Sequence, residues 1–309
     1  MTTEFANRYG IDRRGFMKAG LAGMVAASSK LDAGTPGDEK KPTVWVIEGE
    51  DKARLMREAL EIIERNGGFG KQVRKLALKV NAAWARRPEQ GANTHPQLVR
   101  TFVRRCHALG IKEIVIPENP CNRAEQSFTR SGLREAAEQA GADMIDLKNE
   151  NQYFTDVRLP EGERLKKARV ARQFLEADAV VNMPVAKHHG GATLTMGMKN
   201  WMGAVEDRHF WHRNNLHQCI ADFSTLMRPT WSIIDATRIL PDRGPQGPSP
   251  NLRHPNKLIV SRDPIAADAV AALLFFDEPR KVQYLHLAHD MGLGVIDPER
   301  ITVYNFKLG

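Results

Sequence analysis

Residues 178–205 read DAVVNMPVAKHHGGATLTMGMKNWMGAV, and this stretch indicates both how the chain folds and where it carries chemistry. It begins with the apolar run Ala179–Met183, which has the composition of a buried strand, and it breaks at Pro184. After this break come Lys187, His188 and His189 in a row, then a loop of small residues, and then Lys199 and Asn200 inside a second apolar run. This concentration of reactive groups between two hydrophobic anchors predicts that the fold holds a functional loop here.

Strands and helices alternate along the chain from Pro42 onward. The expected strands are Thr43–Ile47, Lys75–Asn81, Glu113–Pro117, Asp143–Leu147, Ala179–Met183, Trp231–Ala236, Leu258–Ser261 and Ile301–Tyr304. The expected helices are Asp51–Arg65, Gln97–Leu109, Leu133–Ala140, Lys166–Leu175, His217–Met227, Ile265–Phe275 and Val282–Met291. Continuous apolar strands between helices predict an α/β fold, with a mostly parallel, doubly wound, Rossmann-like sheet and helices on both faces. Residues 42–309 are expected to form this one domain.

Residues 1–41 predict a targeting segment and a linker. Arg13 and Arg14 precede Phe16, Lys18 and the weakly apolar run AGLAGMVAASS, a pattern that resembles the twin-arginine export signal. The alternative is the chance start of a basic amphipathic helix. The run is too short to span a bilayer as a helix of the mature chain. We therefore expect an exported, periplasmic or extracytoplasmic protein, carried by the twin-arginine translocation (Tat) machinery and without a transmembrane helix.

Composition narrows the classes of partner. The 309 residues carry a net charge of +8, which favours anionic partners. Acidic residues interrupt the basic ones and no basic tract with interleaved aromatics exists, which argues against nucleic acid. The three cysteines, Cys106, Cys121 and Cys219, exclude a disulfide scaffold but leave one bridge possible. None lies in a CxxC arrangement, so no intrinsic iron–sulfur or zinc–thiolate motif is present.

Several expected strands end in polar residues. Ligands of an open parallel sheet bind beyond the carboxyl ends of the strands. The polar residues at these ends are Lys79, Asn81, Glu118, Asn119, Asn182 and Asp235. Each is a surface residue by default, but their shared position favours one ligand site.

The loop of small residues GGATLTMGMKN is the second feature that indicates an anion-binding site. Backbone N–H groups and a lysine can hold an anion, while a helix start with glycines for close packing is the alternative. The spacing departs from the nucleotide motif GxxxxGK[ST]. Five residues, where the motif has four, separate Gly191 from Gly197, and Lys199 does not directly follow the glycine. We therefore reject nucleotide hydrolysis by that motif.

Histidines supply the candidate acid–base and metal groups. His188 and His189 are neighbours on an extended segment and point to opposite sides, so they do not share one metal. In the segment EDRHFWHRNNLH, His209 and His212 share a helical face and are expected to bind a divalent metal such as zinc, nickel or iron. A solvated polar turn is the alternative for the first segment, and a solvated helix start is the alternative for the second. Asp268 lies one turn into an apolar helix and either pairs with a loop lysine or contacts a ligand.

In combination, these motifs resemble the family called domain of unknown function 362. The matching residues are Lys79-Val80-Asn81, Thr94-His95-Pro96, Ala179–Pro184, Lys187-x-His189, Met198-Lys199-Asn200-x-x-Gly203, Ile234-Asp235, Gly244-Pro245 and Ser261-x-Asp263-Pro264 with Asp268. The family implies no settled activity. Some of its members carry ferredoxin-type cysteine clusters, which this sequence lacks.

A weaker resemblance is to nickel-pincer lactate racemases. In those enzymes a loop histidine precedes a lysine that holds the cofactor, and His189 and Lys199 have similar spacing. The surrounding glycine pattern differs.

These observations lead to one hypothesis, an exported enzyme or cofactor-using protein with an anion or metal site at the carboxyl edge of the sheet. The expected catalytic residues are His188, His189 and Lys199. The expected anion-binding residues are Lys79, Asn81, Asn182, Lys187, Asn200, Asp235 and Asp268, and the expected metal ligands are His189, His209 and His212. The alternatives are a non-catalytic periplasmic protein that binds an anion or metal, and chemistry like that of the nickel-pincer racemases.

Overall fold

The computed structural model describes residues 41–148 and 151–309. The predicted export signal and nearly all of the linker, residues 1–40, lie outside the described residues. Within the two described ranges, no helix is long and apolar enough to cross a membrane.

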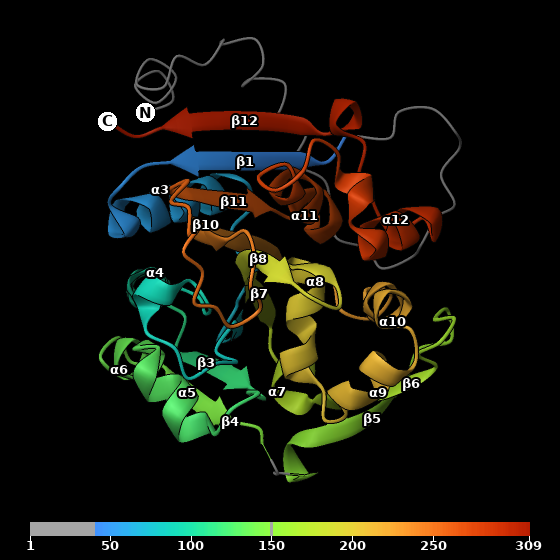
Figure 1. Cartoon of the computed structure of the whole chain (residues 1–309). Coiled ribbons are helices and arrows are strands. Elements are labelled where there is room, and N and C mark those ends of the chain that lie inside the picture. The colour runs from blue at the N-terminus through green and yellow to red at the C-terminus, as the bar shows by residue number, and fades with distance from the viewer. Residues whose placement is uncertain (1–40, 149–150) are drawn as a thin grey trace.

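One large sheet organises the described chain, in the order β12-β1-β11-β10-β7-β2-β3-β4 (Figure 1). Its strands are β1 (Thr43–Glu48), β2 (Lys75–Val80), β3 (Glu113–Glu118), β4 (Asp143–Asp146), β7 (Ala179–Met183), β10 (Trp231–Leu240), β11 (Lys257–Ser261) and β12 (Thr302–Lys307). Along this order only β11 runs antiparallel to its neighbours. The mostly parallel α/β sheet predicted from the sequence is therefore confirmed.

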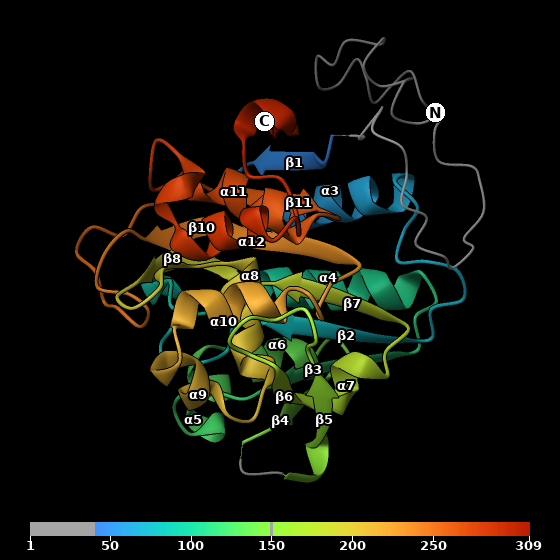
Figure 2. The same ribbon diagram turned by 90° about the vertical axis from the view of Figure 1, so that its right-hand side faces the viewer.

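Helices cover both faces of the sheet, each over its own hydrophobic core (Figures 1 and 2). One face carries α3 (Lys52–Arg65), α4 (Pro96–Ala108), α5 (Ala124–Arg130) and α6 (Leu133–Glu138). The other carries α7 (Arg172–Leu175), α8 (Gly197–Asn200), α9 (Arg208–Arg213), α10 (Leu216–Phe223), α11 (Pro264–Ala272) and α12 (Gln283–Asp290). The short 3₁₀ turn Trp201–Ala204 continues α8.

The predicted helix Lys166–Leu175 is wrong over its first half. Lys167–Ala171 forms strand β6, which pairs antiparallel with β5 (Phe154–Arg158) in a separate two-stranded sheet. Val170 and Ala171 are buried in the core, so pairing and burial override the helical preference of the lysines and arginines around them. Only Arg172–Leu175 is helical.

The segment after Pro184 was expected to be a loop and is instead a hairpin. Strands β8 (Val185–His189) and β9 (Thr193–Thr195) pair antiparallel, and β8 also runs beside the far half of β10. Strand β10 extends four residues beyond its predicted end at Ala236 to support this hairpin. The backbone N–H of Asp235 donates to the carbonyl of Pro184 at 2.8 Å, which joins β10 to the chain at the break.

Asp268 of α11 fixes the start of α8. Its carboxylate accepts from the backbone N–H groups of Gly197, at 2.6 Å, and Met198, at 2.9 Å. A Cβ at Gly197 would lie 2.8 Å from Asp268 Oδ1, so this approach requires glycine. Burial raises the pKa of Asp268 to about 7. Both carboxylate oxygens of Asp268 thus hold the turn that carries Lys199, and its predicted contact with a ligand stays a prediction.

Asp268→Asn should lower the free energy of unfolding by about 2–3 kcal/mol, because an amide accepts through one atom and turns an NH₂ group toward a backbone donor. Urea denaturation measures the change, with the exposed Asp143→Asn as the matched control. A loss no larger than that of the control would contradict this assignment of Asp268.

Candidate functional site

A cleft of about 250 Å³ opens at the carboxyl edge of the sheet. It lies where the winding reverses, since β3 and β4 follow β2 on one side and β7 and β10 lie on the other. Open α/β sheets bind ligands at this position. The polar residues that line the cleft are Asn81, Glu118, Asn119, Cys121, Lys187, His189, Thr195, Lys199, Asn200, Arg208 and His212. Trp84, Met202 and Pro245 contribute apolar surface.

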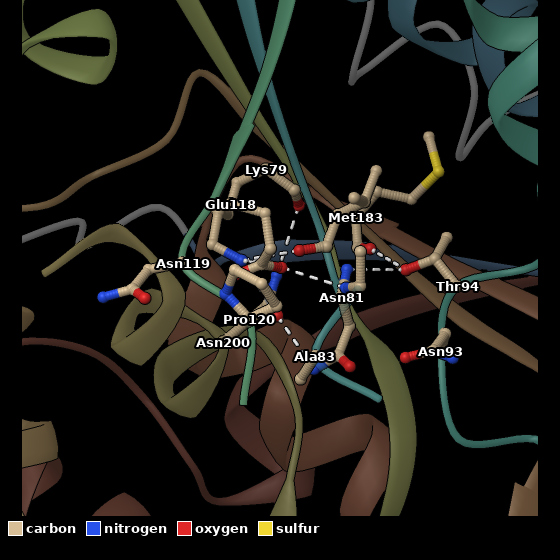
Figure 3. Close-up of polar contacts among 12 residues, drawn as sticks. Lys79, Asn81, Ala83, Asn93, Thr94, Glu118, Asn119, Pro120, Met183 and Asn200 are labelled. Atoms are coloured by element: carbon tan, nitrogen blue, oxygen red, sulfur yellow. Dashed lines mark hydrogen bonds and ion pairs between the residues drawn. The ribbon is translucent and has the colours of Figure 1, made fainter. Parts of the chain in front are cut away.

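A buried ion pair forms the floor of the cleft. Lys79 Nζ lies 3.0 Å from Glu118 Oε2 and also donates to the carbonyl of Val80 (Figure 3). Burial lowers the pKa of Lys79 and raises the pKa of Glu118, and their mutual attraction opposes both shifts. A Cβ at Gly203 would lie 1.7 Å from Glu118 Oε1, so only glycine fits there. Lys79 is therefore paired with Glu118 in this structure, and its predicted role in binding an external anion stays a prediction.

Three asparagines connect the MKN turn to the strand ends, and Figure 3 shows two of them, Asn81 and Asn200. The side-chain amide of Asn200 donates to Asn182 Oδ1, at 2.8 Å, and to the carbonyl of Lys79, at 3.2 Å. Its oxygen accepts from Asn81 Nδ2 at 3.2 Å. Asn182 lies behind this layer and donates to the carbonyl of Gly197. Asn81 and Asn200 thus reach the cleft, while Asn182 supports them from below.

The two loop lysines differ in their partners. Lys187 is 1% exposed and donates to Asn81 Oδ1, at 3.2 Å, and to the carbonyl of Ala92. Lys199 is 8% exposed, and among the described residues its ammonium contacts only the sulfur of Met202, at 3.4 Å. Burial, with the charge of Lys199, lowers the pKa of Lys187 to about 7. Burial, with the charge of Arg208, lowers the pKa of Lys199 to about 8.

Arg208 supplies a third cation. Its guanidinium donates to the carbonyls of Asn119, at 2.8 Å, and Pro120, at 2.7 Å, and contacts Cys121 Sγ at 3.5 Å. These contacts fix the loop after β3 against the start of α9. None of the three cations, Lys187, Lys199 and Arg208, forms an ion pair with a carboxylate of the described chain.

The two adjacent histidines point apart, as predicted. His188 lies outside the cleft, where its Nδ1 accepts from the backbone N–H of Gly244 at 3.2 Å. His189 lines the cleft, and its Nδ1 accepts from the N–H groups of Gly191 and Ala192, both at 3.1 Å. Burial, followed by the charges of the two loop lysines, lowers the pKa of His189 to about 2. His189 is therefore neutral, with its proton on Nε2.

The predicted metal set is only partly assembled. The rings of His189 and His212 stack with centroids 6.2 Å apart, while His209 is exposed and does not line the cleft. The described residues contain no group of three or more histidine, cysteine, aspartate or glutamate side chains that could hold a metal ion.

Asp235 also lies away from the cleft. Its carboxylate accepts from Arg238 Nη1, at 2.8 Å, and from the backbone N–H of His95, at 2.9 Å. Burial is the largest influence on Asp235 and by itself raises its pKa, but the charge of Arg238 and the hydrogen bonds from Thr237 together outweigh burial, so the pKa is lowered. Asp235 thus joins the loop before α4 to β10, and its predicted role in binding an anion stays a prediction.

Three cleft residues were not assigned from the sequence: Thr195, Cys121 and Arg208. The Thr195 hydroxyl is buried and has no hydrogen-bond partner within the described structure. Cys121 is a free, exposed thiol, and Cys106 and Cys219 are free and buried. The polar loop ENPCN after β3 was the available signal for Cys121. Nothing in the local pattern marks Arg208, because its position depends on how α9 packs.

The profile of the family described as domain of unknown function (DUF362) matches residues 76–273. The chain belongs to this family. The chain is also similar to the thylakoid-associated protein sll1697 of Synechocystis sp. (strain ATCC 27184 / PCC 6803 / Kazusa), to which it is 23% identical over 270 residues that cover 82% of each chain.

Two solved structures share 12% identity with this DUF362 chain. One is a Thermotoga maritima protein, with a TM-score of 0.47 over 79% of this chain and 60% of the other. The second is the lactate racemase apoprotein from Thermoanaerobacterium thermosaccharolyticum, with a TM-score of 0.44 over 74% and 57%. The chain spans about three fifths of the length of these two proteins.

Lys79→Met should lower the free energy of unfolding by about 3–5 kcal/mol, because it leaves the Glu118 carboxylate buried without its partner. Denaturant unfolding of the variant measures the loss. The double variant Lys79→Met/Glu118→Gln should recover a large part of it, since the amide oxygen still accepts from Ala82 N–H and carries no charge. Equal losses in the single and double variants would argue against the ion pair.

Proposed function

We propose that this DUF362 protein binds a small organic anion in the cleft and acts on it through Lys199. The observation that carries the proposal is the imbalance of charge. Lys187, Lys199 and Arg208 line the cleft without a carboxylate partner, while Glu118, the one acidic side chain among the described lining residues, is taken by Lys79.

An unpaired ammonium buried in protein costs several kcal/mol. A ligand carboxylate or phosphate that enters between Lys199 and Arg208 would offset that cost. Neutral groups complete the site, since the Thr195 hydroxyl and the Nε2–H of His189 are available as hydrogen-bond donors. The cleft of about 250 Å³ lies near the lower end of ligand pockets, which run from about 300 to 1,000 Å³, so the ligand is small.

Proton chemistry supports an enzyme over a passive binding protein. The amines of Lys187 and Lys199 have pKa values of about 7 and 8 and exchange protons near neutral pH. Measured turnover would separate the two possibilities. Elemental analysis of protein purified from its native compartment tests for a bound metal, and co-purified organic anion without metal would favour the anion site.

Lys199→Met should abolish anion binding yet stabilise the fold. A pKa lowered from 10.5 to about 8 corresponds to about 3 kcal/mol of destabilisation below pH 8. The unfolded chain binds more protons between about pH 8 and 10.5, so wild-type stability rises across this window and the advantage of the variant disappears. Calorimetric titration with inorganic phosphate and simple carboxylates measures binding, and denaturant unfolding at several pH values measures stability.

Two comparisons sharpen this experiment. Lys187→Met should also weaken binding but gain less stability, because Asn81 Oδ1 and the carbonyl of Ala92 lose their donor. Wild-type affinity for the anion should fall as the pH rises through 7 to 8, because Lys187 and Lys199 lose their protons in this range. The charged and titratable groups that face these two lysines are Glu118, Arg208, His189 and His212. Unchanged affinity in Lys199→Met would overturn the proposal.

We also propose that the Tat machinery exports the protein, on the basis of Arg13, Arg14, Phe16 and Lys18. Replacing both arginines with lysine should keep the full chain in the cytoplasm, as measured by cell fractionation. An unchanged distribution would contradict export by this route.

A further inference from the structure

Lys199 is the one cleft lysine of the described chain whose nitrogen is not held by oxygen acceptors. Lys79 is paired with Glu118, and Lys187 donates to two oxygens. The amine of Lys199 meets only the thioether of Met202, a weak acceptor. Its nitrogen is thus free to approach a bound molecule.

The surroundings of Lys199 also favour the neutral amine. Its side chain is 8% exposed, and Lys187 and Arg208 line the same cleft. Burial and neighbouring cations activate lysine nucleophiles in this way. With a pKa of about 8, about a tenth of the amine is neutral at pH 7, against less than about a thousandth for an exposed lysine.

Two neutral donors lie in position to polarise an oxygen atom of the ligand. The Nδ1 atom of His189 is occupied by the N–H groups of Gly191 and Ala192, which leaves its Nε2–H as a donor. The hydroxyl of Thr195 is 3% exposed and has no partner among the described residues. Unpartnered buried polar groups are costly, so this hydroxyl points to an oxygen-bearing ligand.

We propose, building on the anion site above, that Lys199 forms a Schiff base with a small anionic carbonyl compound of the 2-oxo carboxylic acid class. The carboxylate of such an acid meets the positive charge of the cleft, and its carbonyl oxygen meets the neutral donors. A simple carboxylate would be attracted by the cations of the cleft, but it has no carbonyl group with which the free amine of Lys199 could react.

The step is balanced in atoms and charge. The neutral Nζ of Lys199 bonds to the carbonyl carbon, and a proton moves from nitrogen to oxygen to give a carbinolamine. The C–O bond then breaks, the hydroxyl leaves as water with one proton from solvent, and the nitrogen lone pair forms the C=N bond. The product is a protonated imine, whose charge withdraws electrons from the adjacent carbon atoms.

Borohydride trapping tests the proposal on the full chain. Wild-type protein is incubated at pH 7–8 with glyoxylate, pyruvate, phenylpyruvate or 2-oxoglutarate, reduced, and mapped by peptide mass spectrometry. We expect a secondary-amine adduct on Lys199 at least tenfold above the background on the exposed Lys71. Because this comparison is internal to the wild-type protein, it does not depend on the folding of any variant.

Lys199→Arg is the matched variant, since it keeps a positive charge but cannot form an imine. It should still bind propionate, which has a carboxylate and no carbonyl, and should show no adduct at position 199. If propionate binds the wild-type protein but no 2-oxo acid of the panel is trapped on Lys199 above background, the Schiff base is overturned and the anion site stands. If neither propionate nor any 2-oxo acid binds, both proposals fail.

Discussion

The buried ion pair between Lys79 and Glu118 is the interaction on which the site depends. It joins the ends of β2 and β3 beneath the cleft, and it positions the backbone N–H of Ala82 through the same carboxylate oxygen. Because the Glu118 carboxylate is paired with Lys79, it does not neutralise Lys187 and Lys199 above it. The cleft is cationic because its one lining carboxylate, within the described chain, is already satisfied.

A second layer of contacts converts this floor into a rigid frame. Asn200 hydrogen-bonds both neighbouring strands, and Asp268 holds the first N–H groups of α8 from another helix. Thr94 accepts from the N–H of Asn81 and donates to the carbonyl of Met183, which joins the ends of β2 and β7 (Figure 3). Most polar residues of the family motifs therefore build the frame, and few remain to meet a ligand. Such second-layer support is what fixes reactive groups in a usable geometry.

The fold was largely predictable from the sequence, because the central strands β7, β10 and β11 contain apolar runs, and such runs indicate burial on both faces of a sheet. The strand β6 was missed because its partner β5 lies in a charged segment with no apolar signal of its own. For the site, the strand ends and the lysine–histidine segment indicated the edge of the sheet at which the cleft opens. The local pattern does not distinguish a buried acid that faces a ligand from one that faces backbone donors, as Asp235 and Asp268 do. Arg208 could not be found because only tertiary packing brings it to the loop after β3.

The rim of the cleft is set by a backbone contact. A Cβ at Gly244 would lie 1.8 Å from the carbonyl oxygen of His188, so the loop that follows β10 rests directly on the hairpin strand. The next residue, Pro245, lines the cleft. Insertions or deletions within residues 241–250 would therefore change how long a molecule the cleft admits without changing the cations that line it, Lys187, Lys199 and Arg208. Proteins that share this cationic cleft can in this way differ in the size of the molecule that they accept.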